Sequence, residues 1–469
     1  MKQDTRKTKH RQPRIAGIEV TSDILTGRAG LALFARYLDQ IELGWFLSRW
    51  FGPLRKSAKG LAAAECIRQI LLFLVDGTSR HLTHFDSLKD DEGYAAAIER
   101  RPEDLASSHV VKRFIRGISF GRIWLLRKLL QELFIWRLCL AKPKIVILDL
   151  DVMVMENDDA ERREGVRPTY KKVKGFAPLQ MVWNRIIVDA VFRAGHHHSN
   201  HKDSTEKMVA HVVRLIRRRY SKTVPILIRQ DAGYFDQKLF DLYEELGVAY
   251  VSGGKLYKDI KELVASYGTE GWATHVNGEQ EWSYLEFGNR RENWRRFRRV
   301  VFCRPTYEDR QMLLEFARPD TVIYTNIGMG TAVDQALREA GSGHLLDASG
   351  VIECYHGRGF DELVHRAYKD FVDQRLPFKR FRQNTAYYYM TFLAFVLFEA
   401  FKADVTDLVV GETAYATTFR RRFIDVAGKI VTHAGRIVLK VTRAALDRLR
   451  LDELWLLCSS PPKLPPLAV

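Results

Sequence analysis

The chain has 469 residues and a net charge of +17, because its 74 Lys and Arg outnumber its 57 Asp and Glu. Hydrophobic residues make up 46% of the chain, which excludes wholesale disorder, and the positive charge is typical of proteins that bind nucleic acid. The five cysteines stand apart without a CxxC pair, which argues against a Cys-based zinc module or a disulfide framework and favours a cytoplasmic setting. The longest apolar run, residues 390–400, is too short to span a bilayer, so no membrane partner is expected.

The N-terminal part of the chain is predicted to be a basic tail followed by helices. Residues 1–14 are rich in Lys and Arg, and apolar residues recur at helical spacing across residues 28–140. A basic helical unit is a common vehicle for DNA binding, so residues 1–142 are interpreted as the tail and a helical DNA-binding domain. A helical bundle that serves packing alone is the open alternative.

The pattern changes at Pro143, where strand-like runs begin to alternate with helices. An apolar run at residues 145–151 ends in Asp151, and a later run at residues 224–228 leads to Asp231. The other expected elements are strands at 179–183, 186–192 and 248–251, with helices at 203–220 and 235–246. This order predicts an α/β layer with a mixed sheet over residues 143–252.

Residues 253–350 break that rhythm and are predicted to be a β-rich insertion. Six of the ten residues from Arg290 to Arg299 are Arg, interleaved with aromatic rings, a composition that suits contacts to DNA phosphates. The candidate DNA-binding residues of this cluster are Arg295, Arg296, Arg298 and Arg299. A solvated charged hairpin is the alternative interpretation.

The last third of the chain is expected to be largely helical. A helical pattern runs over residues 353–375, although Gly357 and Gly359 disfavour a regular helix at its start, and a nearly all-apolar helix follows at 385–401. Residues 351–402 therefore contribute two helices, and residues 403–469 form a C-terminal basic region with short strands and one basic helix over 442–457.

Three acids stand out as candidates for chemistry: Asp151, Asp231 and Glu362. Acids at the ends of buried strands are costly unless they are paired or bind a cation. Three converging carboxylates without Cys or His partners suit Mg²⁺ or Mn²⁺, and two such ions can hold the attacking and leaving oxygens of a phosphodiester in line. A strand-end Asp that only caps a turn is the common alternative.

The segment around Glu362 strengthens this hypothesis. Tyr355, Arg358, Glu362 and Lys369 are spaced three, four and seven residues apart, which places them on one face if the segment is helical. That face would present a carboxylate to a metal ion and two cations to a phosphate, whereas a solvated helix face is the alternative.

The spacing Tyr355-x2-Arg358-x3-Glu362-x6-Lys369 resembles the Tyr–Arg–Glu–Lys signature of DDE-class transposases of bacterial insertion sequences. Four flanking segments are similar to the same family, including the runs that end in Asp151 and Asp231; they are residues 147–151, 174–179, 228–234 and 376–386. The resemblance covers about residues 25–445. The small residue and Thr that often follow the family's first Asp are Val152 and Met153 here, so Asp149 stays open as the first acid beside Asp151.

The resemblance implies a multidomain α/β protein whose RNase H-like core carries a β-rich insertion and follows the helical domain. It implies a DNA transposase that cuts at transposon ends and joins the 3′-OH to target DNA with Mg²⁺ or Mn²⁺. The implied partners are double-stranded DNA, as terminal inverted repeats and target, and a second copy on paired ends, in the bacterial cytoplasm at the nucleoid. In such relatives the residues equivalent to Tyr355, Arg358 and Lys369 contact end DNA.

Two other functions stay open on the sequence alone. One is an RNase H-like nuclease that cuts without strand transfer, and the other is a non-catalytic, domesticated DNA-binding regulator. A separate histidine-rich stretch, residues 195–201, has the composition of a small zinc site but lacks a Cys partner or a helical His spacing.

Overall fold

The computed structural model describes residues 15, 17–52, 60–160, 162–268, 270–278, 280–306, 320–434 and 436–465, apart from the side chains of residues 360 and 361. The basic tail expected at residues 1–14 lies outside this description. Across the described parts of the chain, no helix is both long and apolar enough to cross a membrane.

The predicted N-terminal helices are confirmed. They are α1 (Leu31–Gln40), α2 (Leu43–Phe51), α3 (Ala63–Asp76), α4 (His84–Lys89), α5 (Glu92–Ala97), α6 (Ser108–Gly117) and α7 (Phe120–Ala141). Two of them begin at residues whose side chains accept a backbone N–H of the first turn, Asp91 before α5 and Ser107 before α6. In α3 nearly every side chain is buried, so this helix forms the centre of the unit made by α1–α7, called the helical unit below.

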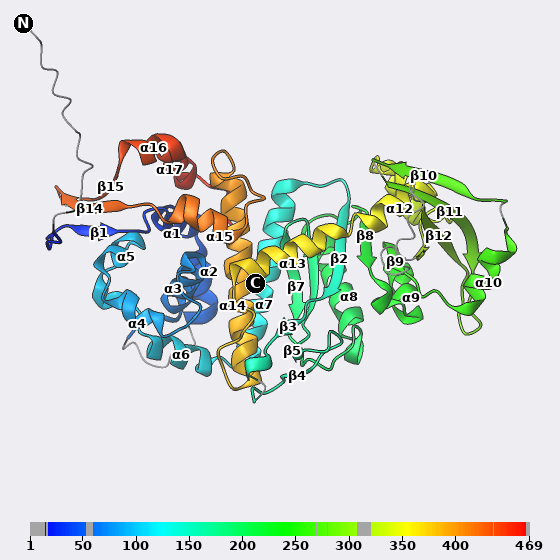
Figure 1. The fold of residues 1–469 in the computed structure, drawn as a ribbon, viewed down its shortest axis with the longest axis horizontal. Helices are drawn as coiled ribbons and strands as arrows, with labels where there is room; N and C mark the ends of the chain where they lie inside the picture. Colours follow the sequence, from blue (N-terminus) through cyan, green and yellow to red (C-terminus); the bar gives the residue numbers. More distant parts are fainter. Residues whose placement is uncertain are drawn as a thin grey trace, which may run out of the picture.

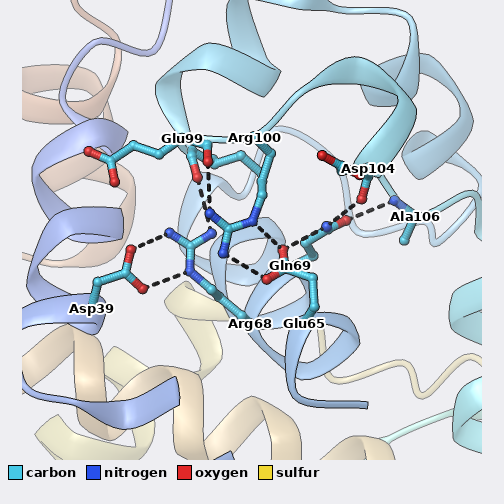
Figure 2. A network of polar contacts seen from close by, with 9 residues as sticks. Asp39, Glu65, Arg68, Gln69, Glu99, Arg100, Asp104 and Ala106 are labelled. Carbon is cyan, nitrogen blue, oxygen red and sulfur yellow. Dashed lines mark hydrogen bonds and ion pairs between the residues drawn. The ribbon is translucent and has the colours of Figure 1, made fainter. Parts of the chain in front are cut away.

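A polar network fastens α3 to its neighbours (Figure 2). Arg68 of α3 is 4% exposed, and it donates to both carboxylate oxygens of Asp39 on α1, at 3.1 and 2.9 Å, and to the Ile98 carbonyl at 3.0 Å. Arg100 likewise donates to both carboxylate oxygens of Glu65, at 2.9 and 2.8 Å. Such two-pronged pairs fix both distance and angle, so they set how the helices sit against one another.

One large mixed sheet extends from the middle of the molecule to its right-hand end in Figure 1. Its strand order is β10-β11-β12-β13-β9-β8-β2-β6-β7. The strands are β2 (Val146–Val152), β6 (Leu179–Trp183), β7 (Ile186–Val191), β8 (Ile226–Gln230), β9 (Ala249–Gly253), β10 (Ala273–Asn277), β11 (Gln280–Asn289), β12 (Arg298–Thr306) and β13 (Thr321–Thr325). Strands β2, β8 and β9 run parallel, and the other pairs are antiparallel. The predicted α/β layer with a mixed sheet is therefore confirmed.

The local connections follow from the sequence. Asn184 takes a left-handed φ of 55° in the tight turn between β6 and β7, a conformation that Asn tolerates well. Helix α8 (Ser204–Arg219) joins β7 to β8, and α9 (Gln237–Glu245) joins β8 to β9. Both helices bury one apolar face, as the sequence spacing predicts.

The stretch predicted as a β-rich insertion supplies β10 to β13, and these strands continue the central sheet through an antiparallel pairing of β13 with β9. The same stretch contains α10 (Lys258–Ser266) and α11 (Ala332–Glu339). It is thus an extension of the sheet edge, drawn at the right of Figure 1.

The helical pattern expected over residues 353–375 is divided into two helices. Helix α12 (Ala348–His356) ends at Gly357, and α13 (Gly359–Phe371) begins after Arg358. Helix α14 (Phe381–Phe401) is buried from Asn384 onward and packs against α7 and α3, between the helical unit and the sheet (Figure 1). Its apolar sequence therefore forms core, as predicted.

The C-terminal region returns to the N-terminal helices. Strand β14 (Gly428–His433) pairs with β15 (Arg436–Val441) and with β1 (Ile24–Thr26), and α17 (Leu451–Ser459) packs on α1. The basic helix expected over residues 442–457 is two helices, α16 (Arg443–Leu449) and α17, because Arg450 between them adopts a left-handed φ of 47°.

We expect Arg68→Met to lower the free energy of unfolding by about 3 kcal/mol, because it removes the buried partner of Asp39 and of a backbone carbonyl. The matched control is Arg101→Met, since the Arg101–Glu103 pair is 3.9 Å apart and its side chains are 80% and 67% exposed. The control should change stability by less than about 0.5 kcal/mol. If the two changes lower the free energy of unfolding equally in urea, the network does not stabilise the fold as proposed.

Candidate active site

The two predicted strand-end acids lie side by side at one edge of the sheet. The parallel register pairs Asp149 with Arg229 and Leu150 with Gln230, so Asp151 and Asp231 come next on the neighbouring strands β2 and β8. Both carboxylates are partly exposed, at 29% and 40%. Carboxyl ends of adjacent parallel strands are a common place for a site, because loops can open there while the strands stay rigid.

Asp149, the alternative first acid, is engaged in the core. It is 4% exposed, and its two oxygens accept hydrogen bonds from Arg229 at 2.5 and 2.7 Å. Arg229 also donates to the carbonyl of Cys354, at the end of α12, at 3.1 Å. Asp149 therefore serves a buried ion pair, while Asp151 faces the accessible edge.

The break between α12 and α13 brings two signature residues to Asp231. Nη1 of Arg358 lies 3.9 Å from a carboxylate oxygen of Asp231 and, among the described residues, has no hydrogen-bond acceptor. A Cβ on Gly253, at the end of β9, would fall 2.6 Å from the hydroxyl oxygen of Tyr355, so the hydroxyl fits only because that residue is glycine. Tyr355, on α12, and Arg358, in the break after it, thus lie beside the Asp231 segment, whereas the single helix face considered from the sequence spacing is divided between α12 and α13.

Asp151 has a partner that sequence reasoning missed. Nδ1 of His365, on α13, is 3.3 Å from one of its carboxylate oxygens, and the other oxygen accepts the Val152 N–H at 2.7 Å. Burial acts to raise the pKa of Asp151, but the hydrogen bond and attraction of His365, with the Val152 N–H and Arg358, outweigh it and lower that pKa below its ordinary value. The available signal was the three-residue spacing of Glu362 and His365 on one helix face.

Asp231 shows the opposite shift. Burial, and then the charge of Asp151, raise the pKa of Asp231, although Arg358 and the Gly233 N–H act to lower it. The two carboxylates therefore repel each other in this arrangement, and a cation between them would relieve the repulsion. Hard oxygen donors of this kind fit Mg²⁺ or Mn²⁺.

The third predicted acid is not gathered with the other two. Glu362 lies exposed in the first part of α13, and no group of three or more His, Cys, Asp or Glu among the described residues is arranged to hold a metal ion. It precedes His365 by one turn, so it lies on the side of α13 that meets Asp151. The structure thus brings Asp151 and Asp231 together, while Glu362, one turn before His365 on α13, lies outside that pair.

Lys369 lies on the same side of α13. Burial, and then the positive charge of Lys171, lower the pKa of Lys369, while Asp151 acts to raise it. Lys369 is therefore close to Asp151 and to a second lysine, Lys171, that the sequence analysis did not single out. Both amines are available to an anion that approaches Asp151.

The arginine cluster divides into buried and exposed members, which corrects part of the prediction. Arg298 is 1% exposed and pairs with Asp241 and Glu244, and Arg299 is 6% exposed and pairs with Glu286. These two guanidinium groups hold β12 to its neighbours and are buried, so they are not presented at the surface as the prediction required. Arg295 and Arg296 are exposed, although Arg296 also contacts Glu244 at 2.9 Å.

The histidine-rich stretch forms a stacked pair. The rings of His197 and His201 lie parallel with centroids 3.7 Å apart, and burial lowers the pKa of His197 to about 4. These residues belong to the described part of the chain in which no metal-holding group is found. The geometry gives no support to the zinc alternative.

The comparison with family models decides the class of protein. A model described as transposase DDE domain group 1 matches residues 7–456. The chain belongs to this transposase family. It is accordingly a DNA transposase, an enzyme of a class that cleaves DNA with divalent metal ions.

The other comparisons give a distant neighbour. A cryo-EM structure of piggyBac transposase in a synaptic complex with hairpin DNA is 11% identical, with a TM-score of 0.30, over 79% of this chain and 81% of that one. No curated protein matches this transposase in sequence.

Asp149→Asn should lower the free energy of unfolding by about 3–5 kcal/mol, because Arg229 loses its buried carboxylate partner. Asp151→Asn should cost less than about 1 kcal/mol, since Asp151 is partly exposed and its repulsion with Asp231 is removed. Urea unfolding of the two variants measures the difference. If the two variants are equally unstable, the division between a structural and an accessible acid is wrong.

Proposed function

We propose that Asp151, Asp231 and Glu362 are the catalytic acids of this transposase and hold Mg²⁺ or Mn²⁺ at the edge of the sheet. The observation that carries the proposal is the placement of Asp151 and Asp231 at adjacent strand ends, beside the Tyr355–Arg358 segment. A divalent ion bound there would act as a Lewis acid on the phosphate and lower the pKa of the attacking water.

The protein's own groups hold the DNA in this proposal. Arg358 has an unused donor near Asp231 and can hold a phosphate oxygen next to the scissile bond. Lys369 supplies a second positive charge on the Asp151 side. Fixing a phosphate on both sides aligns it for in-line attack, first by water and then by the freed 3′-OH on target DNA.

The strand order supports an RNase H-like core. Strands β7, β6, β2, β8 and β9 are consecutive in the sheet, with an antiparallel β2–β6–β7 meander followed by parallel β8 and β9. We assign the core to residues 143–252 and 351–402, interrupted by the β-rich insertion at 253–350. The region 403–469 is assigned as a C-terminal region that packs on the helical unit.

Residues 1–142 are proposed as the part that recognises transposon ends. Lys128 of α7 lies 5.0 Å from the ring of Trp50 on α2 and 5.8 Å from that of Trp124, and Trp124 is 56% exposed. Cations held on exposed aromatic rings suit a phosphate backbone. A homodimer on paired ends follows from the reaction, because one active site is needed at each end. The proposed cellular location is the bacterial nucleoid, where the DNA substrate lies.

Asp151→Asn, Asp231→Asn and Glu362→Gln should each lower metal-dependent cleavage at least about a hundredfold, because each removes a metal ligand. Their DNA affinity should stay unchanged, since no basic residue is altered. The assay uses a plasmid that carries the coding region with its own flanking DNA, and Glu245→Gln, an exposed acid on α9, is the control.

Normal cleavage by any of the three variants would remove that acid from the proposed site. A second substrate, the same ends supplied precut with a free 3′-OH, separates a transposase from a nuclease: the wild-type protein should join them to target DNA. Cleavage without joining would favour the nuclease alternative.

A further inference from the structure

A small hairpin lies beside the candidate active site. Strand β5 (Lys174–Phe176) pairs with β4 (Arg167–Pro168) on one side and with β3 (Met155–Glu156) on the other in a separate three-stranded sheet, and the hairpin tip between β4 and β5 is Thr169–Val173. The Thr169 N–H donates to the Val173 carbonyl at 2.9 Å, and the Thr169 hydroxyl donates to the same oxygen. Lys172 completes the turn with a left-handed φ of 61°.

The base of the hairpin is held closely by its neighbours. A Cβ on Gly175 would fall 2.0 Å from the Met155 carbonyl, and one on Gly195 would fall 2.3 Å from the Arg167 carbonyl. Backbone therefore packs directly on backbone at both positions, which only glycine permits. The tip is consequently carried on a rigid support.

Tyr170 at the tip is anchored by its hydroxyl at the active site. The hydroxyl donates to the carbonyl of Val152, the residue after Asp151, at 3.3 Å. The side chain is nevertheless 64% exposed, so the ring is available. Partial burial, and then the charges of Asp151 and Asp231, raise the pKa of Tyr170 to about 12. A tyrosine whose hydroxyl is tied to backbone offers its ring face to a partner.

Positive charge surrounds this ring. Nζ of Lys171 lies 5.8 Å from the centre of the Tyr170 ring. Burial, and then the positive charge of Lys171, lower the pKa of Lys369, so the two lysines are close to each other. Lys171 and Lys172 are both exposed. An aromatic ring with amines beside it, next to two carboxylates suited to a metal ion, matches a strand of nucleic acid: bases have flat faces, and phosphates have negative charge.

We propose that the hairpin tip is a DNA-strand clamp, in which Tyr170 stacks on a base next to the scissile phosphate and Lys171, with Lys369, binds the adjoining backbone. The inference rests on the proposed function, since it places the reacting DNA at Asp151 and Asp231. The base must be unpaired or at a strand end to present its face, so the clamp acts on single-stranded or frayed DNA at the cut.

The first test measures affinity for a fluorescein-labelled oligodeoxythymidylate, without divalent metal and at raised salt, where stacking persists and phosphate contacts weaken. Tyr170→Leu should weaken binding by roughly five- to a hundredfold, the effect of one lost stacked base. Tyr170→Phe should bind like the wild-type protein, because the ring remains. Lys171→Ala should reduce the slope of log affinity against log salt by about 0.7, whereas Lys222→Ala, an exposed lysine elsewhere, should not.

The second test locates the contact. Oligodeoxythymidylate carrying 5-iododeoxyuridine is cross-linked by light to the protein, and the attached peptide is identified by mass spectrometry. The cross-link should fall on Tyr170 in the wild-type protein, persist at the same position in Tyr170→Phe, and be lost in Tyr170→Leu. Circular dichroism of each variant verifies that the fold is intact.

Wild-type affinity in Tyr170→Leu, or equal losses in Tyr170→Phe and Tyr170→Leu, would overturn the stacking role. Cross-links confined to Trp45 and Trp124 would move single-strand binding to the helical unit. Because both tests run without metal, they are independent of cleavage: normal cleavage by Asp151→Asn would refute the proposed catalytic acids and leave the clamp result standing.

Discussion

The arrangement of the proposed active site depends on one buried guanidinium. Arg229 on β8 grips Asp149 on β2 and donates to the Cys354 carbonyl at the end of α12. It thereby joins the two strands that end in Asp151 and Asp231 to the helix that carries Tyr355. A Cβ on Gly357 would fall 3.0 Å from Nη1 of Arg229, so the guanidinium packs closely against this glycine. An ion pair in the core is costly to bury, and its value here is positional: it fixes three segments with respect to one another.

Around Arg229, the buried elements of the fold and the accessible groups of the site are different parts of the chain. The strands and α14 are buried, whereas the groups that meet DNA in our proposal lie at strand ends, at the break between α12 and α13, and on the β4–β5 tip. Arg358, just before α13, lies beside Asp231, and His365, in the middle of α13, lies beside Asp151. The site therefore combines repelling carboxylates, which favour a cation, with basic groups that favour a phosphate.

Much of the fold could be predicted from the sequence, because its signals are local. Apolar segments such as β2, β8 and the nearly all-apolar α14 are stable only when they are buried in a core. The arginine cluster shows the limit: Arg298 is buried by partners on α9 and Arg299 by a partner on the neighbouring strand β11, contacts that form only in the folded chain, while Arg295 is exposed. Tyr170 and His365 were missed for the same reason, since their contacts with Val152 and Asp151 exist only in the folded chain. Tyr355 ends up on α12 and Arg358 in the break after it, so the helical spacing that drew attention to both residues does not continue through the segment.

The most direct test of the proposed metal site is iron-mediated backbone cleavage of the protein bound to its end DNA. Fe²⁺ that replaces Mg²⁺ generates hydroxyl radicals with ascorbate and peroxide, and these cut the polypeptide next to the bound ion. We expect cuts beside Asp151, Asp231 and Glu362 that excess Mg²⁺ suppresses, because all three carboxylates hold the ion in the proposed site. Cuts at other segments, or cuts at these three that Mg²⁺ leaves unchanged, would contradict it.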